Sequence, residues 1–191
     1  MSTPPDYRRD GVAACASEGE LLRRAAAGDT PAFDRIVEMY TAPIYRHAFR
    51  IVRNRQEAED VTQEAFLKAY RGLGAYDFSK SFRSWLYAIA TNTGLNALRK
   101  QRRRREAPFE EAEFAEAGTN PAARNALKEE VAVILAELMP RDALLLQLHY
   151  AEGMSIREAG DVVGLSEGAA KTALCRARKR MRELLIERDK L

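Results

Sequence analysis

Basic and polar side chains gather near the end of the chain, in the stretch SIREAGDVVGLSEGAAKTALCRARKR at residues 155–180. Arginine, lysine and small polar side chains are the residues that contact phosphates and base edges in the major groove of duplex DNA. The candidates here are Glu167, Gly168, Lys171, Thr172, Cys175, Arg176, Arg178 and Lys179. The chemistry that this group indicates is non-covalent recognition of duplex DNA.

The elements that would position these side chains are two short helices joined by a tight turn. Glycine tolerates the left-handed conformation that ends a helix, so Gly164 ends the first one, and Ser166 can cap a second helix from about Glu167. The apolar stripes are Ile156, Ala159, Gly160 and Val163 on the first helix and Ala170, Leu174, Ala177 and Met181 on the second. This is the layout of a helix-turn-helix, although a solvated helical hairpin can show the same pattern.

A second group suited to nucleic acid begins with FRSWLYAIATN at residue 82. One helical stripe there carries Trp85, Asn92, Asn96, Arg99 and Arg103. Rings stack on unpaired bases, amides bind base edges and guanidinium groups bind phosphates. Trp85 alone is more typical of a core, but the four consecutive arginines at 102–105 are hard to explain by packing. The stripe therefore predicts a groove for unstacked nucleic acid.

Charge is segregated along the chain, although the net charge is only +3. Residues 82–105 carry seven basic side chains and no acid, whereas residues 106–122 carry five glutamates and no base. This pattern predicts a polyanion-binding face followed by a self-repelling acidic linker over residues 107–122.

A small polar group interrupts the helical segment AEDVTQEAFLKAY at residues 58–70. Asp60, Gln63 and Glu64 share one helix face, opposite a predicted buried stripe of Ala58, Val61, Ala65, Phe66, Ala69 and Tyr70. Such a face can be an ordinary solvated surface, or an acidic docking surface for a basic partner helix.

The whole pattern predicts an all-α fold of two small helical domains joined by a flexible acidic linker, with the helix-turn-helix in the second. The expected divisions are a disordered tail at 1–17, a first domain at 18–106, the linker at 107–122 and a second domain at 123–191. Helices are expected at about 18–27, 30–52, 55–71, from 82, at 122–139 and at 142–150. Asp29 or Thr30 is expected to cap the second of these helices, which could have a kink before Pro43. Asn54 and Glu57 have the spacing of a capping box.

Several classes of protein find no support in the sequence. The two cysteines, Cys15 and Cys175, form no disulfide framework, and His47 and His149 lie far apart, so no metal or other cofactor is expected. No phosphate-binding loop, nucleophile elbow or zinc-protease motif is present, which predicts neither an enzyme nor a small-molecule substrate. No apolar run approaches the ~20 residues that span a bilayer, and we expect a cytoplasmic protein without direct membrane insertion.

Three segments resemble, in order and spacing, the small two-domain extracytoplasmic-function group of the bacterial housekeeping-type sigma factors. They are the 58–70 segment, the 82–92 segment and the helix-turn-helix preceded by Leu138, Met139 and Pro140. The resemblance covers about Glu18 to Leu185. Each segment alone is a weak indication, whereas the three together are highly specific.

The resemblance implies a role for each predicted surface. Residues 18–106 would be sigma region 2, docking on RNA polymerase through Asp60, Gln63 and Glu64 and melting the minus-ten element. A flipped base would lie in a pocket involving Gly72, Tyr76, Ile89 and Asn92, under the loop Gly74–Phe82. Residues 123–191 would be region 4, which reads the minus-35 element.

The implied partners are promoter DNA, the clamp helices of the largest subunit and the flap region of core RNA polymerase, and an anti-sigma factor, which in this family is often membrane-tethered. The acidic linker would extend toward the polymerase active centre. A regulator that binds duplex DNA alone, or an adaptor with a sigma-like fold, is the alternative. The first would leave the Asp60 face and the Trp85 groove unexplained, and the basic and aromatic residues of 85–105 argue against the second.

The chain also departs from the pattern typical of the family. Gly168, Ala169 and Ala170 stand where Gly, Thr and Val are common, and Ala173 and Ala88 stand where arginine is common. Gly160 replaces the usual alanine, which we expect to cost about 1 kcal/mol of helix propensity without altering the packing. Cys175, in the recognition helix, is either redox-active or an inert or buried small residue, and the second interpretation is favoured.

Overall fold

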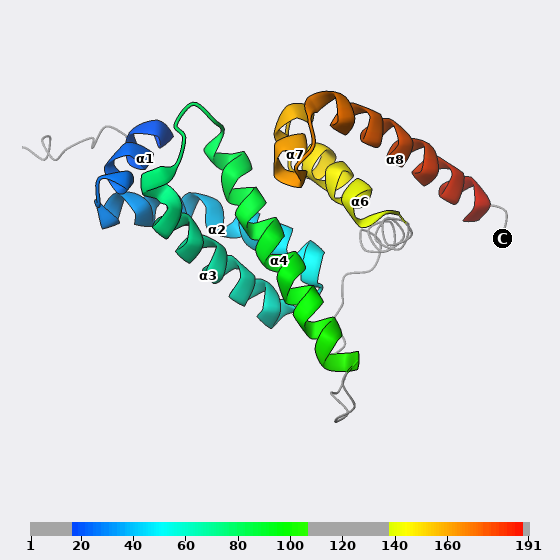
Figure 1. Cartoon of the computed structure of the whole chain (residues 1–191), viewed down its shortest axis with the longest axis horizontal. Coiled ribbons are helices and arrows are strands. Elements are labelled where there is room, and N and C mark those ends of the chain that lie inside the picture. Colours follow the sequence, from blue (N-terminus) through cyan, green and yellow to red (C-terminus); the bar gives the residue numbers. More distant parts are fainter. Residues whose placement is uncertain (1–16, 107–137, 189–191) are drawn as a thin grey trace, which may run out of the picture.

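The computed structural model describes residues 17–106 and 138–188, and within these ranges it contains helices and turns without a strand. The elements are α1 (Glu18–Ala26), α2 (Thr30–Val52), α3 (Arg55–Gly72), the 3-10 turn η1 (Leu73–Ala75), α4 (Phe82–Glu106), α6 (Pro140–Leu146), the π-type turn η2 (Gln147–Ala151), α7 (Ile156–Val163) and α8 (Glu167–Arg188). Helices α1–α4 form one unit and α6–α8 another (Figure 1). The all-α prediction is confirmed.

Local signals account for the helix boundaries of the first unit. The Asp29 side chain caps α2 by accepting from the backbone N–H of Ala32, and Asn54 caps α3 by accepting from that of Glu57. Helix α2 continues through Pro43 as one helix. The predicted start of α3 is therefore correct, with the Asn54 half of the expected capping box in place.

The second unit contains the predicted helix-turn-helix. Gly164 ends α7 in the left-handed conformation, with φ of 71°, and the Ser166 hydroxyl accepts from the backbone N–H of Ala169 at the start of α8. A complete capping box forms at Ser155 and Glu158, which the sequence analysis did not identify although the Ser-x-x-Glu spacing was visible. Residues 1–16 of the tail predicted at 1–17, the linker predicted at 107–122 and residues 122–137 of the helix predicted at 122–139 lie outside the described residues.

Gly160 lies where α7 meets the turn and the next helix. A Cβ at this position would lie 3.0 Å from the backbone oxygen of Leu165 and 3.1 Å from the Cβ of Ala170. Neither neighbour is a flexible side-chain end that could rotate away. The expectation that glycine here leaves the packing unaltered is therefore wrong, because the glycine sets how closely the turn approaches α7.

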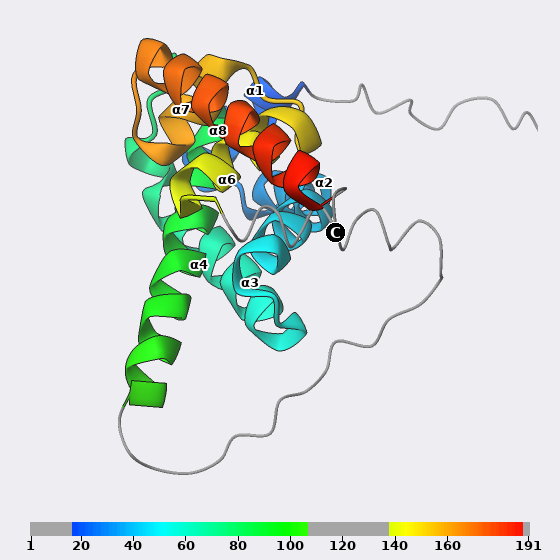
Figure 2. The same ribbon diagram turned by 90° about the vertical axis from the view of Figure 1, so that its right-hand side faces the viewer.

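The two units pack against each other instead of standing apart. Helix α7 lies beside α4 and contacts it directly (Figures 1 and 2). The buried apolar side chains of both units form one continuous cluster. Helix α8 lies on the side of its unit away from α4, while the last turns of α4 extend clear of the other helices. The large, fully buried side chains include Ile36, Ile44, Leu73, Leu86, Tyr87, Leu145, Leu148 and Met154.

Candidate nucleic-acid interface

The predicted recognition face of α8 is exposed. Glu167, Gly168, Lys171, Thr172, Cys175, Arg176, Arg178 and Lys179 are all accessible to solvent. Ala170, Ala173, Leu174 and Ala177 are buried on the opposite side and hold α8 against α6 and α7. The amphipathic division read from the sequence is confirmed, and Ala173 lies on the buried side. DNA contact by the exposed face stays a prediction.

Arg176 also has a structural role that the sequence analysis missed. Its guanidinium group donates from Nε and Nη2 to the carboxylate of Asp142 in α6, at 2.9–3.0 Å. The Asp142 side chain is only 6% exposed, whereas that of Arg176 is 66% exposed. This hydrogen-bonded ion pair anchors the recognition helix to α6 and raises the pKa of Arg176.

Cys175 is an exposed free thiol, so the interpretation of it as a buried residue is wrong. It lies at the centre of the recognition face because residues 168, 171, 172 and 179 surround it at helical spacing. Arg178 donates to the hydroxyl of Tyr150 at 3.4 Å, which places one guanidinium at the edge of the face.

Two of the four residues predicted to form a base pocket, Gly72 and Tyr76, lie at an aromatic cluster with Trp85. The rings of Tyr76 and Trp85 are 4.9 Å apart, and the ring of Phe82 is 5.7 Å from each of them. A Cβ on Gly72 would lie 3.2 Å from the Trp85 ring, so the glycine lets that ring pack closely against the end of α3. The structure thus brings Gly72, Tyr76 and Trp85 together.

Tyr76 supports the loop above this cluster. Its ring is buried and its hydroxyl donates to the backbone oxygen of Lys80, which closes the loop between η1 and α4. Burial, with the nearby carboxylates of Glu18 and Asp77, raises the pKa of Tyr76 and keeps this donor protonated. Phe78 projects from the same loop and is 47% exposed. An exposed ring at a pocket rim is available to stack on a base.

The rest of the α4 stripe leads away from the aromatic cluster. Ile89 is half-buried, whereas Asn92, Asn96, Arg99 and Arg103 are exposed. Arg99 donates to the side-chain oxygen of Asn96 at 2.9 Å, which orients both groups along the helix. The predicted stripe is therefore continuous and accessible over most of its length. Its role in binding DNA stays a prediction.

The second predicted surface on this unit is the outer face of α3. Asp60, Gln63 and Glu64 are exposed, and Glu64 forms an ion pair with Lys68 at 2.7 Å. A groove of about 480 Å³ between α2 and α3 adjoins Gln63. It is lined by Thr30, Phe33, Asp34, Val37, Thr41, Thr62, Gln63, Phe66, Leu67 and Tyr70.

The apolar part of this groove was missed from the sequence. Leu67 lies on the same helix face as Asp60, Gln63 and Glu64 and is 55% exposed. A leucine on a polar helix face was the signal in the sequence that could have indicated an apolar contact surface. Tyr70 was predicted to be buried and is 42% exposed, because none of the described helices covers the end of α3 at the groove. The outer face of α3 therefore combines acidic and apolar groups, as protein interfaces do.

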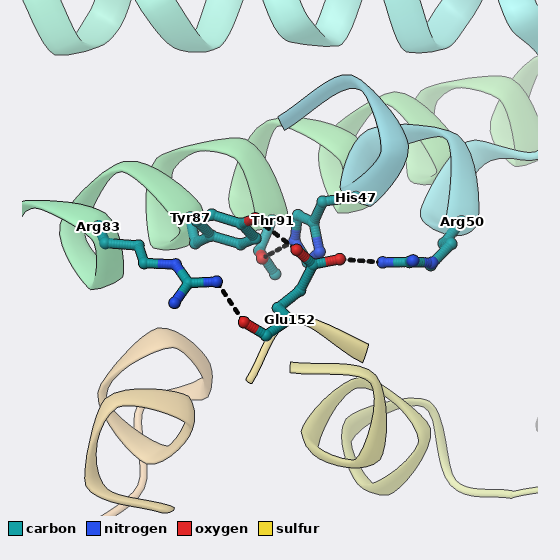
Figure 3. A network of polar contacts seen from close by, with 6 residues as sticks. All are labelled: His47, Arg50, Arg83, Tyr87, Thr91 and Glu152. Atoms are coloured by element: carbon teal, nitrogen blue, oxygen red, sulfur yellow. Dashed lines mark hydrogen bonds and ion pairs between the residues drawn. The ribbon is translucent and has the colours of Figure 1, made fainter. Parts of the chain in front are cut away.

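Glu152 joins the two units through a polar network that the sequence analysis did not predict (Figure 3). Its carboxylate accepts from Arg50 of α2 and, at 2.7 Å, from the hydroxyl of Tyr87 in α4. Arg83 donates to the backbone oxygen of Glu152. Burial acts to raise the pKa of Glu152, but the hydrogen bonds from Tyr87 and Arg50 outweigh it, so the pKa is lowered and the group is ionised at neutral pH.

His47 lies beneath this network. It is fully buried, its Nε2 is 2.8 Å from the hydroxyl of Thr91, and its ring centre is 4.9 Å from that of Tyr87. Its Nδ1 has no hydrogen-bond partner within the described parts of the chain. Burial lowers the pKa of His47 to about 4, so the ring is neutral near pH 7.

The fold and these surfaces define a two-domain helical protein with a helix-turn-helix in its second domain. Residues 36–104 match the family Sigma-70 region 2, and residues 128–181 match Sigma-70, region 4. The ECF RNA polymerase sigma factor SigW of Bacillus subtilis is 30% identical over 181 residues, which cover 86% of this chain and 94% of that protein. The RNA polymerase sigma-H factor of Pseudomonas aeruginosa is 34% identical over 172 residues, covering 84% and 89%.

Solved structures give the same result. The chain matches CnrH, solved in complex with the cytosolic domain of CnrY, with a TM-score of 0.70 and 26% identity over 89% of this chain and 97% of that one. The chain therefore belongs to the ECF sigma factors of RNA polymerase, a family of transcription regulators. Among the described helices, none is long and apolar enough to span a membrane.

Proposed function

We propose that this sigma factor directs bacterial core RNA polymerase to promoters by using two separate DNA surfaces. The α8 face around Lys171 and Thr172 reads the minus-35 element as duplex. The α4 stripe and the aromatic cluster around Trp85 hold the minus-ten element as unpaired bases. The observation that carries the proposal is the presence of both kinds of surface on one chain of this family.

The aromatic cluster at the end of α3 and the start of α4, together with the stripe that continues along α4, couples sequence selection to melting. Extruding a base from a duplex costs a few kcal/mol of stacking and pairing. The exposed Phe78 ring and the amide of Asn92 offer new stacking and hydrogen bonds to a base that has left the helix. A base that fits recovers part of that cost, so the matching sequence opens most readily.

The α3 face is the proposed polymerase-docking site. Asp60 and Glu64 present exposed carboxylates, and Leu67 and Tyr70 place apolar surface beside them. Acidic groups around an apolar centre suit a basic amphipathic helix, as the clamp helices of the largest polymerase subunit would supply. Region 4 would contact the flap region.

The remaining assignments follow from the same proposal. The polymerase carries out the catalysis, and the sigma factor itself is not an enzyme. It acts in the cytoplasm, where the polymerase is, and its acidic linker at 107–122 follows a path toward the polymerase active centre. The related CnrH was solved with the cytosolic domain of CnrY, and a comparable anti-sigma factor would control this chain.

Reversing the charge of the docking face tests the proposal. Asp60→Lys combined with Glu64→Lys should weaken binding to core polymerase at least tenfold, because close like charges at an interface cost several kcal/mol. The variant should keep its helical circular dichroism spectrum, since both side chains are exposed. Binding is measured by fluorescence anisotropy of the labelled sigma factor titrated with core enzyme.

The matched control reverses two other exposed carboxylates, Glu20 and Glu38, which lie outside the groove lining. This control should bind core enzyme like the unchanged protein. Equal binding by both double variants would remove the α3 face from the docking site.

A further inference from the structure

The contact between the two units depends on a few polar side chains. The carboxylate of Glu152 accepts hydrogen bonds from Arg50 and Tyr87, and its backbone oxygen accepts one from Arg83. The hydroxyl of Ser81 donates to the carboxylate of Glu158 at 3.2 Å. The Glu152 side chain is only 5% exposed. A shielded carboxylate is strongly unfavourable unless charged and hydrogen-bonding partners compensate it, so the closed arrangement depends on these partners.

The backbone between Gln147 and Met154, here called the corner, holds Glu152 toward the first unit. The backbone N–H of Glu152 donates to the oxygen of Gln147, and that of Met154 donates to Leu148, so the π-type turn η2 closes on itself. His149 makes a further bond to the backbone oxygen of Met154 at 2.7 Å. Gly153 has a φ of 66°, which glycine adopts readily, and lets the chain reverse directly after Glu152. Glu152 therefore reaches the first unit from a rigid corner.

The receiving side is equally well defined. Tyr87 is fully buried, and Arg83 lies over its ring at 5.7 Å. Arg50 and His47 approach from α2 on the other side of the carboxylate (Figure 3). Arg50, Tyr87 and Arg83 therefore surround Glu152 with hydrogen-bond donors, next to the proposed minus-ten stripe of α4.

The closed arrangement is too compact for both proposed promoter contacts. The minus-ten and minus-35 elements are centred about 25 base pairs apart, which is ~85 Å of duplex at ~3.4 Å per pair. In the structure α7 contacts α4, and only the turn Gly164–Ser166 separates α7 from α8. Helices of eight and 22 residues rise by ~12 and ~33 Å, so the two reading surfaces lie within a few tens of ångströms.

The closed arrangement also affects the two surfaces unequally. Helix α8 lies on the side of the second unit away from α4 (Figure 1), and its predicted reading face is exposed. By contrast, Asn92 and Arg99 line a cleft of about 720 Å³ whose opposite wall includes Asp161 and Gly164 of the second unit. The carboxylate of Asp161 would repel phosphates entering this cleft.

We propose that Glu152 is an autoinhibitory latch that holds region 4 against region 2 and must release before this chain can engage both promoter elements. The inhibitory part of this inference rests on the proposed function, whereas the latch itself rests on the contacts alone. Interfaces between domains of one chain are small and polar enough to open, and docking on polymerase would supply the free energy. The latch lowers the apparent affinity for polymerase by the fraction of molecules that are open.

Distance measurement tests the latch directly. Spin labels at Gln56 and Arg182, both exposed, report the separation of the two units by double electron–electron resonance in a full chain whose two cysteines are replaced by serine. The labelled chain that keeps Glu152 should give one short, narrow distance distribution. Glu152→Gln should shift the ratio of closed to open molecules by roughly 10- to 100-fold, because it removes charge-assisted hydrogen bonds.

Two further variants keep the test independent of misfolding. Tyr87→Phe removes one hydrogen bond and preserves the buried ring, so it should open the chain in the same direction but less. Glu187→Gln removes an exposed charge elsewhere in the second unit and should leave the distances unchanged. Identical distributions for Glu152→Gln and Glu187→Gln would overturn the latch, as would a long, broad distribution in the unmodified chain.

Titration with core polymerase then tests the inhibitory role. Glu152→Gln should bind core enzyme up to tenfold more tightly than Glu187→Gln, because fewer molecules have to open first. If Glu152→Gln opens the chain but binds polymerase no more tightly, the inhibitory role is wrong. Failure of every variant to bind polymerase would instead count against the proposed function, with the distance result unaffected.

Discussion

At the scale of single residues, His47 is a buried group whose ionisation opposes folding. Burial lowers its pKa from the ordinary 6.5 to about 4, and the opposing effect of Glu152 is smaller. The folded state therefore prefers the neutral ring. This contribution to the free energy of unfolding is complete above about pH 6.5 and is lost as the pH falls from there to about 4.

We predict that protonation of His47 removes roughly 3 kcal/mol of stability across that interval, since one pKa unit corresponds to about 1.4 kcal/mol. Urea unfolding of the full chain and of His47→Gln at a series of pH values measures this. The variant should be less stable near pH 7 and should lose less stability on acidification. Met39→Gln, an exposed substitution on the same helix, is the control and should follow the unchanged protein. Parallel pH dependence in His47→Gln and the unchanged chain would contradict the assignment.

At the scale of elements, the sequence predicts structure best where the signal is local. The caps at Asp29, Asn54 and Ser166 and the left-handed Gly164 were predictable because a cap or a turn is set by residues three or four positions apart. The α4 stripe and the α8 face followed from helical spacing in the same way, whereas the pocket residues Gly72 and Tyr76 were expected only from the resemblance to sigma factors. The exposure of Tyr70 was not predictable, because it depends on whether another helix covers that end of α3.

The turn between α7 and α8 offers a test of packing against propensity. Gly160→Ala should gain up to about 1 kcal/mol of helix propensity, but it crowds Leu165 and Ala170, and overpacking costs about 1–3 kcal/mol. We predict a net loss of about 1 kcal/mol in thermal or urea unfolding. Gly19→Ala in α1 has nothing within 4 Å and should be neutral or stabilising. A Gly160→Ala variant as stable as the original chain would show that the turn can shift at little cost.

At the scale of the whole molecule, the closed arrangement of the two units could not be read from the sequence. Glu152 meets Tyr87 across 65 positions and Arg50 across 102, so no periodicity links them. Glu152 follows a short turn, and nothing in the local sequence distinguishes it from other glutamates. The same holds for Arg176, whose pairing with Asp142 depends on how α8 crosses α6. The α8 face and the α4 stripe can each be predicted from the sequence. Whether both are available to DNA at the same time depends on how the two units pack.

Run-off transcription with purified bacterial core polymerase tests the central claim most directly. Templates with randomised upstream sequence are transcribed with and without this chain, and the transcribed templates are sequenced. We predict transcripts that depend on the protein and share sequence near ten and thirty-five bases upstream of their start, with fewer transcripts for Asp60→Lys combined with Glu64→Lys. No dependent transcripts, together with tight binding of duplex DNA by the chain alone, would show that the protein is a stand-alone regulator and not a sigma factor in function.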